Sequence, residues 1–222
     1  MKQIVTIESI RPLTHDVLQI RTAKPDDIHF EPGQAADISI HQPAWEQELR
    51  PFTFTSLPSE SALEFTIKTY PSHNGVTNQL RTLKVGDELM VHEVFGDIAY
   101  KGEGLFIAGG AGITPFIAIF KQLEKENRIG SNKLIFANKT RGDIILEDKF
   151  RTLLGPNFMN VLSGEESVGY EHGHVSAALI EKHRKDATSY VYLCGPDPMM
   201  EAVGQQLQEL KVPEDRIVRE GF

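Results

Sequence analysis

The residues Leu105–Phe116, LFIAGGAGITPF, constrain the fold more strongly than any other stretch of this sequence. They predict a buried strand at Leu105–Ala108, a turn that carries three glycines, and a helix that opens at Thr114-Pro115. The turn glycines are Gly109, Gly110 and Gly112. A helix that starts directly behind a strand presents free N–H groups and a positive dipole end beside open space. The turn therefore suits a diphosphate, although glycines in such turns also serve close packing alone.

The length and charge of the chain narrow the choice of fold and partner. Its 222 residues, 40% of them hydrophobic, are enough for one large or two small domains. Residues 1–101 contain nine basic and fourteen acidic residues, and residues 102–222 contain fourteen basic and seventeen acidic ones, which gives the net charge of −8. Because neither half is basic, nucleic acid and anionic membranes are poor candidates as partners.

Several kinds of segment and site are not indicated by the sequence. No apolar run reaches the roughly 18 residues that span a bilayer, and the N-terminal residues lack a signal-peptide core, so we expect a cytoplasmic protein. Cys194 is the only cysteine, which excludes an internal disulfide and a cysteine-ligated iron–sulfur cluster in this chain. His172 and His174 flank a glycine in a loop-like stretch, where a solvated loop fits better than a metal site. We predict no metal.

The first hundred residues contain short β-rich runs separated by turn residues. Apolar residues take every second place in Leu63–Lys68, as in a β-strand. The spacing of the runs predicts a six-stranded antiparallel β-barrel. The expected strands are Gln3–Ile10, Val17–Thr22, Ala35–Ile40, Phe52–Ser56, Leu63–Thr69 and Glu88–His92.

From residue 102 onward strands alternate with helices, which predicts a parallel-sheet α/β domain. The fold class is therefore β + α/β, with domains at 1–101 and 102–222. Ligands bind at the carboxyl ends of such strands, where Gly109–Thr114 and Cys194-Gly195-Pro196 lie. After Leu105–Ala108 we expect strands Lys133–Ala137, Asn160–Leu162 and Tyr190–Leu193, helices near Leu146–Leu154 and Ser176–His183, and a last helix with Met199, Val203, Leu207 and Leu210 on one core-facing stripe.

Two places in the first half carry residues suited to a cofactor. In Arg50-Pro51-Phe52-Thr53 the arginine offers a charged fork for a phosphate, and Phe52 on the same strand face offers an aromatic plane. Thr53 presents a hydroxyl on the other face. Gly75-Val76-Thr77 predicts a glycine followed by a short helical turn, whose N–H groups suit an anion. Taken alone, the first stretch is better explained by an ordinary barrel strand with a surface arginine, and a plain hairpin loop explains the second at least as well.

These motifs together resemble the ferredoxin–NADP reductase family, in its compact two-domain form without an iron–sulfur domain. The resemblance spans nearly the whole chain, and Pro115 in the third place of G-x-G-x-x-G is a departure from the usual dinucleotide fingerprint. The matching motifs, in family order, are Pro32-Gly33-Gln34, Arg50-Pro51-Phe52-Thr53, Gly75-Val76-Thr77, Gly109–Pro115, and Cys194-Gly195-Pro196 with Met199.

The resemblance implies a flavin in the barrel, FAD rather than FMN, and NADH or NADPH in the α/β half. Phe52 stands where the family more often has a tyrosine. It keeps the aromatic ring that would stack on the flavin and lacks the phenol hydroxyl. Thr53, Cys194 and Glu220 are implied as polar neighbours of the reacting rings. The flavin contacts that it implies are Arg50, Pro51, Phe52, Thr53, Lys68, Tyr70, Gly75, Val76, Thr77 and the terminal Phe222. The implied nicotinamide dinucleotide contacts are Gly110, Gly112, Thr114, Pro115, Cys194, Gly195, Pro196 and Met199.

The implied activity is hydride transfer from nicotinamide C4 to flavin N5, followed by electron transfer to a separate acceptor such as flavodoxin or ferredoxin. A component reductase of an oxygenase, or a reductase of small acceptors or free flavin, stays open. A non-catalytic flavin-binding regulatory subunit is the alternative of another class. We expect a monomer. Lys139 or Arg141 would favour NADPH, whereas Asp143 would repel its 2′-phosphate.

Overall fold

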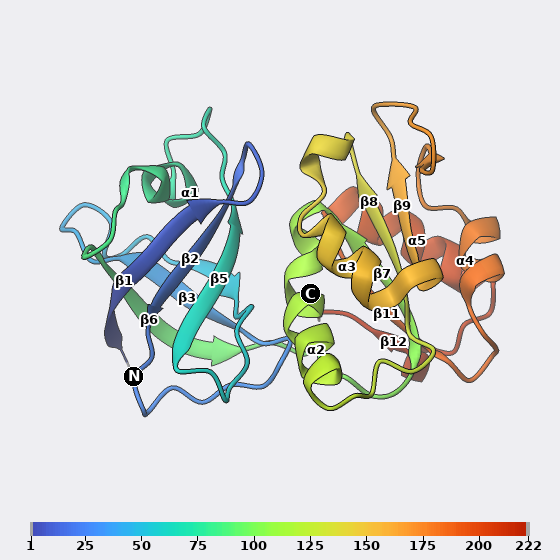
Figure 1. Cartoon of the computed structure of the whole chain (residues 1–222), viewed down its shortest axis with the longest axis horizontal. Coiled ribbons are helices and arrows are strands. Elements are labelled where there is room, and N and C mark those ends of the chain that lie inside the picture. The colour runs from blue at the N-terminus through green and yellow to red at the C-terminus, as the bar shows by residue number, and fades with distance from the viewer. Residues whose placement is uncertain (1, 221–222) are drawn as a thin grey trace.

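The computed structural model describes residues 2–220, which form two six-stranded sheets in two lobes that lie side by side (Figure 1). The first sheet is antiparallel, with the strand order β4-β3-β6-β1-β2-β5. A short helix, α1 (Val76–Gln79), follows β5. The strands are β1 (Gln3–Pro12), β2 (Val17–Ala23), β3 (Ala35–Ile40), β4 (Arg50–Thr53), β5 (Ala62–Lys68) and β6 (Glu88–Phe95).

The first sheet closes on itself because the chain stops pairing with β3 after Thr53 and pairs with β5 instead. Phe54 bridges to Phe65 of β5, and the Thr55 N–H donates to the carbonyl of Glu64 at 2.7 Å. The six-stranded antiparallel sheet is as predicted. The bounds of the predicted strand Phe52–Ser56 are wrong, since β4 pairs with β3 only over Arg50–Thr53.

The second sheet is parallel, with the order β10-β9-β8-β7-β11-β12. Its strands are β7 (Gly104–Gly109), β8 (Lys133–Asn138), β9 (Phe158–Leu162), β10 (Glu171–His172), β11 (Tyr190–Cys194) and β12 (Ile217–Val218). Its longer helices are α2 (Thr114–Lys125), α3 (Glu147–Leu154), α4 (Ala177–His183) and α5 (Asp197–Glu209). The α/β prediction is confirmed. The two-residue strands β10 and β12 were not predicted, because so short a segment shows no periodicity and its pairing depends on its neighbours.

Helices cover both faces of the parallel sheet, because the side chains of β7 alternate between them. Phe106 and Ala108 pack in the core that contains the buried residues of α2 and α3. Leu105 and Ile107 pack on the other face with residues of α4 and α5, including the predicted stripe residue Val203. Helix α2 lies between the sheet and the barrel (Figure 1).

Tyr192 of β11 holds the segment that joins the two lobes. Its hydroxyl donates to the Gly102 carbonyl at 2.7 Å and accepts from the N–H groups of Lys101 at 2.8 Å and Gly102 at 3.0 Å. Its ring stacks on Phe106 with 4.1 Å between centroids, and burial raises the pKa of Tyr192 to about 12. The connection between the lobes is therefore tied to β11 of the parallel sheet.

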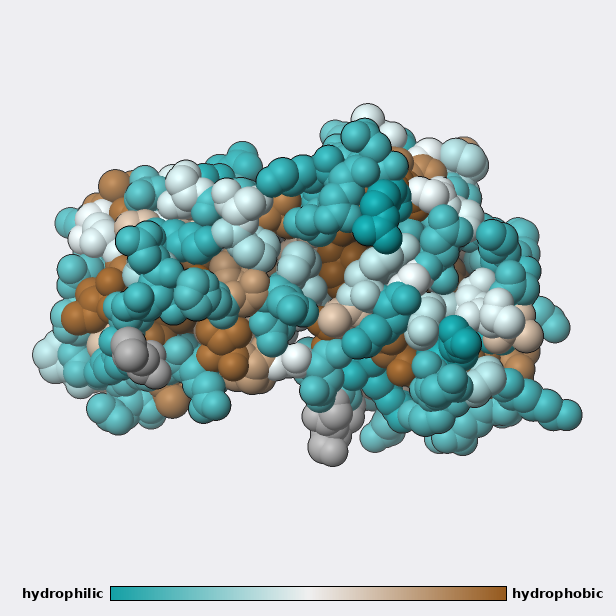
Figure 2. All heavy atoms as spheres, turned by 90° about the horizontal axis from the view of Figure 1, so that it is seen from below, coloured by the Kyte–Doolittle hydropathy of each residue, from teal (hydrophilic) through white to brown (hydrophobic). Residues whose placement is uncertain are grey.

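Seen from below, the surface of the molecule is mostly hydrophilic, with apolar groups scattered over both lobes (Figure 2). Among the helices within residues 2–220, none combines the length and the apolar character that crossing a bilayer requires.

Candidate functional site

Two glycine-containing turns meet at the carboxyl edge of the parallel sheet. Ala108 of β7 pairs with Cys194 of β11, so the residues that follow them, Gly109 and Gly195, lie side by side. A Cβ atom on Gly112 would lie 2.2 Å from the carbonyl oxygen of Cys194. Only glycine permits this approach of two backbones, and it joins the two turns into one cradle.

Met199 lies against the base of this cradle. A Cβ atom on Gly109 would lie 2.3 Å from the Met199 sulfur and 3.0 Å from Pro196 Cδ. Gly110 differs, because its φ is +50° and nothing lies within 4 Å of the place a Cβ atom would take. The cradle is thus packed from below and open at Gly110, which leaves room for a ligand.

Helix α2 opens where the sequence predicts. A 3₁₀ turn over Gly110–Ile113 leads into Thr114, whose hydroxyl donates to the Ala111 carbonyl at 3.0 Å. Pro115 stands in the first turn of the helix, where its lack of an N–H costs nothing. No side chain caps the helix start, and the Thr114 N–H donates to the Ala111 carbonyl, so the N–H groups open to a ligand are those of the glycine turn ahead of the helix. This is the environment that favours an anionic group.

The first lobe contacts the cradle through Thr53. The hydroxyl oxygens of Thr53, at the end of β4, and Thr114, at the start of α2, lie 3.2 Å apart. Both side chains are at least partly buried. The structure therefore brings the end of the Arg50–Thr53 motif directly against the glycine turn of the other lobe.

Arg50 projects from the edge strand β4 into solvent. Its guanidinium donates to the Leu49 carbonyl at 2.6 Å and lies 3.4 Å from Glu48, with about half of the side chain exposed. Pro51 fits an edge strand because it has no N–H to donate to a neighbour. Phe52 is half-buried and packs partly against the barrel core. The charged fork is thus accessible to a phosphate, and the aromatic side chain lies on the same strand.

Glu220 connects the end of the described chain to both lobes. Its Oε2 accepts from the Asp97 N–H at 3.2 Å, and its Oε1 lies 3.4 Å from where a Cβ atom on Gly96 would stand. Its charge also acts on Cys194. Thr53, Cys194 and Glu220, which the sequence proposes as neighbours of the reacting rings, therefore lie around one junction between the lobes.

Lys68 and Tyr70 flank the end of β5. Lys68 pairs with Asp16 at 2.7 Å, and the backbone N–H and hydroxyl of Thr69 donate to the Asp16 carbonyl at 2.7 and 2.9 Å. Tyr70 is exposed and stacks on His73, with 5.4 Å between ring centroids. The side chains of Lys68 and Thr69 are thus committed within the barrel, and Tyr70 presents a ring at the surface.

The predicted turn after Gly75 is present as α1. Gly75 has extended backbone ahead of the helix and nothing within 4 Å of a Cβ position. Val76 is buried in the barrel core, and Thr77 is half-buried. Any contact of Val76 with a bound group would therefore come from its backbone.

Two further predictions from the sequence concern the terminal Phe222 and the loop histidines. The terminal Phe222 lies outside the described residues. His172 lies in β10 and is exposed, as is His174. Within residues 2–220, the single group with metal-ligand spacing is His15, Asp16 and Asp143, in which Asp16 is already paired with Lys68.

Asn138 is a residue of this edge to which the sequence reading gave no role. It ends β8 directly after Ala137, which pairs with Gly109 of the turn. Its side chain is buried, and neither the amide oxygen nor the amide nitrogen has a hydrogen-bond partner. A buried amide without a partner is costly, so it suits a polar ligand group or water. Its position directly after a buried strand is the signal that sequence reading could have used.

The thiol of Cys194 should be unreactive in the folded protein at neutral pH. The residue keeps some exposure, yet burial, with a smaller effect of Glu220, raises the thiol pKa to about 12 from its usual 9.0. The neutral thiol thus stabilises the fold below pH 9, and this contribution is lost as the pH rises toward 12. Iodoacetamide should label Cys194 at pH 8 far more slowly than in unfolded protein, as followed by mass spectrometry. Equal rates would contradict a buried neutral thiol.

Both lobes match known families. Residues 2–98 match the FAD-binding domain family, and residues 106–205 match the oxidoreductase NAD-binding domain family. The chain therefore carries an FAD-binding domain followed by an NAD-binding domain. The predicted flavin and nicotinamide dinucleotide cofactors are confirmed at this level.

Full-length comparisons agree with this assignment. The chain is 32% identical over 231 residues to NADH-cytochrome b5 reductase 1 of Aspergillus terreus, covering 93% of this chain and 77% of the relative. It is 27% identical over 233 residues to the reductase component of propane 2-monooxygenase of Rhodococcus jostii, which covers 97% of this chain and 62% of the relative. The solved structure of the CS-b5R domains of human Ncb5or has a TM-score of 0.85 at 26% identity, and the match covers 98% of this chain and 68% of that one. The chain spans about 62% to 66% of the length of several of these oxygenase reductases.

Proposed function

We propose, since this chain belongs to the ferredoxin–NADP reductase family, that it is an NAD(P)H-dependent flavoprotein reductase that passes electrons to a separate acceptor. The observation that carries the proposal is the 3.2 Å approach of Thr53 to Thr114. It places the end of the flavin motif beside the start of the nucleotide motif, as direct transfer between two bound cofactors requires.

The first lobe offers residues that fit FAD. We assign the phosphate to the exposed guanidinium of Arg50 and to the backbone of Gly75-Val76-Thr77. Phe52, Lys68 and Tyr70 border the flavin in this assignment, with Thr53 beside the ring. Arg50 fits because its present partners are a carbonyl and a carboxylate at 3.4 Å, which a phosphate can replace.

The second lobe offers residues that fit a nicotinamide dinucleotide. The diphosphate would take the open side of the cradle at Gly110 and Gly112 and lie beside the start of α2 at Thr114 and Pro115. Cys194, Gly195 and Pro196 would border the nicotinamide, with Met199 beneath. The partnerless amide of Asn138 would meet a hydroxyl of the nucleotide, which satisfies a group that is otherwise unpaired.

The bound cofactors supply the redox chemistry, a hydride passing from nicotinamide to flavin. The chain contributes orientation and exclusion of water. Cys194 offers a neutral hydrogen-bond donor beside the nicotinamide, and Glu220 places a negative charge at the same junction. No side chain needs to act as a strong base.

We propose NADH as the better donor, because acidic groups surround the loop after β8. Asp143 Oδ2 accepts from the N–H and hydroxyl of Thr140, both at 2.8 Å. Glu165 accepts from the Arg141 N–H at 3.0 Å, and Glu147 lies 3.9 Å from the Arg141 guanidinium. These carboxylates would repel a 2′-phosphate, and Glu147 pairs with the arginine that would otherwise bind it.

The natural acceptor is proposed to be a protein, and the oxygenase component of a multicomponent system is favoured over flavodoxin or ferredoxin. Several relatives are reductase or electron-transfer components of oxygenases. Both halves of this chain are acidic, which suits an acidic flavodoxin or ferredoxin poorly. We further propose a monomer that divides into domains 1–101 and 102–222.

An anaerobic titration tests the proposed function. The purified protein should be yellow, and NADH should bleach its flavin absorbance at about tenfold lower concentration than NADPH. In the variant Glu165→Gln, the difference between the NADH and NADPH concentrations needed for bleaching should become smaller. A yellow protein that neither nucleotide reduces would instead indicate a flavin-binding subunit without this activity. Bleaching by NADPH at the lower concentration would contradict the proposed donor.

A further inference from the structure

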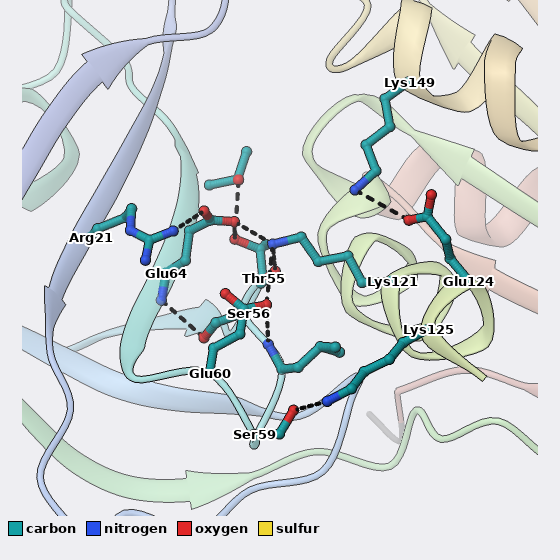
Figure 3. Close-up of polar contacts among 12 residues, drawn as sticks. Arg21, Thr55, Ser56, Ser59, Glu60, Glu64, Lys121, Glu124, Lys125 and Lys149 are labelled. Atoms are coloured by element: carbon teal, nitrogen blue, oxygen red, sulfur yellow. Dashed lines mark hydrogen bonds and ion pairs between the residues drawn. The ribbon is translucent and has the colours of Figure 1, made fainter. Parts of the chain in front are cut away.

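Helix α2 is attached to the first lobe at two buried points. At its start, the hydroxyl of Thr114 lies 3.2 Å from that of Thr53. Two turns further on, Lys121 reaches across to the first lobe, where its Nζ donates to the Thr55 carbonyl at 2.6 Å and to Glu64 Oε1 at 2.8 Å (Figure 3). Residues seven apart lie on one side of a helix, so the two attachments share one stripe of α2.

Lys121 has a second carboxylate, Glu60, at 3.8 Å, but its nearer partner is held in place by the barrel itself. Glu64 of β5 is 5% exposed, and its Oε1 also accepts from the Thr55 hydroxyl at 3.1 Å. Its backbone N–H donates to Ser56 Oγ at 3.0 Å, and Arg21 lies 3.7 Å from its other oxygen. The side chain of Lys121 is 17% exposed. Both charges are therefore largely removed from water and have a fixed geometry.

The two attachments fall on one extended segment of the first lobe. Thr53 and Thr55 are two residues apart, so α2 lies along this segment and is held at both ends. Removing the attachment at Lys121 would leave the hydroxyl contact between Thr114 and Thr53 as a pivot. Helix α2 and the cradle residues at its start could then turn about this point and change their orientation relative to the first lobe.

We propose that Lys121, through its ion pair with Glu64, is a positioning residue that sets how closely the nicotinamide site approaches the flavin site. This inference rests on the proposed function. Hydride transfer depends steeply on geometry, and a misplacement of about 1 Å can slow it roughly 100-fold. Lys121 itself touches neither cradle nor motif, so its effect is on position rather than on binding.

The folding of α2 does not depend on Lys121. The other side of the helix buries Phe116 and Phe120 in the core beside the parallel sheet. Lys125, one turn further along, makes the corresponding exposed contact, with Nζ at 2.7 Å from Ser59 Oγ (Figure 3). It provides a matched control, because it joins the same two lobes without burying a charge.

The test compares Lys121→Met with Lys125→Met in rapid-mixing reduction of the FAD-loaded enzyme by NADH. Lys121→Met should keep its flavin and its Kd for NADH within about threefold, while the rate constant for flavin reduction falls at least tenfold. Lys125→Met should stay within about twofold of wild type in both. A wild-type reduction rate in Lys121→Met would overturn the proposal.

A double variant separates positioning from stability. Lys121→Met alone leaves the buried Glu64 carboxylate without its nearest cation, which should lower the melting temperature. Glu64→Gln/Lys121→Met removes both charges and should recover the melting temperature while reduction remains slow. Recovery of the rate together with stability would show a merely structural role and overturn the proposal. If wild-type protein itself is not reduced by NADH, the proposed function fails instead.

Discussion

Replacing Arg50 with alanine should give a folded protein that binds FAD about 100-fold more weakly than wild type and purifies nearly colourless. Two charge-assisted hydrogen bonds from a guanidinium to a phosphate are together worth about 3 kcal/mol, which corresponds to roughly that factor. The fold should survive, because Arg50 is exposed on an edge strand and supports no buried group. Flavin absorbance per protein and a titration with added FAD measure the effect.

The control for this experiment is Arg11→Ala, which removes another exposed arginine of the barrel. Arg11 donates to Gln19 at 2.7 Å on β1 and β2, away from β4. Its flavin content should equal that of wild type. Full flavin occupancy in Arg50→Ala would remove the phosphate from this residue. Loss in both variants would indicate a general effect of charge on the barrel.

Local patterns in the sequence were enough to predict the two kinds of sheet. Alternation in Leu63–Lys68 reflects a strand with an apolar and a polar side, both of which the fold largely buries, and the continuous apolar run Leu105–Ala108 reflects a strand whose two buried sides are both apolar. The opening of α2 at Thr114 follows from glycine and proline chemistry within a few residues. Such features depend on neighbours along the chain, and they are therefore visible before the fold is known.

The contacts between the lobes could not be predicted in the same way. Lys121 is one of several lysines in the second half, and nothing nearby indicates that its partner is Glu64 of a different sheet. Glu220 was proposed from family resemblance, yet its hydrogen bond to the Asp97 N–H depends on how the chain end returns between the lobes. The partnerless amide of Asn138 likewise follows from burial by distant residues.

The spacing of the cradle also emerges only from the structure. The sequence indicates that Gly112 lies in a turn, without showing what stands opposite. In the fold, the opposing atoms belong to the backbone of Cys194 and Gly195, more than 80 positions later in the chain. Backbone atoms cannot rotate away as a flexible side chain can, so this glycine tolerates substitution less well than Gly110, which faces open space.

Gly112→Val should therefore abolish most nucleotide binding while the flavin stays in place. A Cβ atom at this position would stand 2.2 Å from the Cys194 carbonyl oxygen, 2.4 Å from its carbon and 2.6 Å from the Gly195 nitrogen. The turn must move away by about 1 Å or more, which separates the two halves of the cradle. Flavin reduction at limiting NADH should fall by at least about 100-fold. Flavin content should be unchanged, because Arg50 and its neighbours belong to the other lobe.

Gly204→Ala provides the matched control for this change. Gly204 lies within α5 of the same lobe, and the nearest atom to its added Cβ would be Arg219 Nη1 at 3.6 Å, an ordinary contact. Reduction by NADH should stay within about twofold of wild type, since alanine also favours the helix. Normal NADH affinity in Gly112→Val would mean that the cradle does not hold the nucleotide. Simultaneous loss of flavin would mean that the two cofactors are not divided between the lobes as proposed.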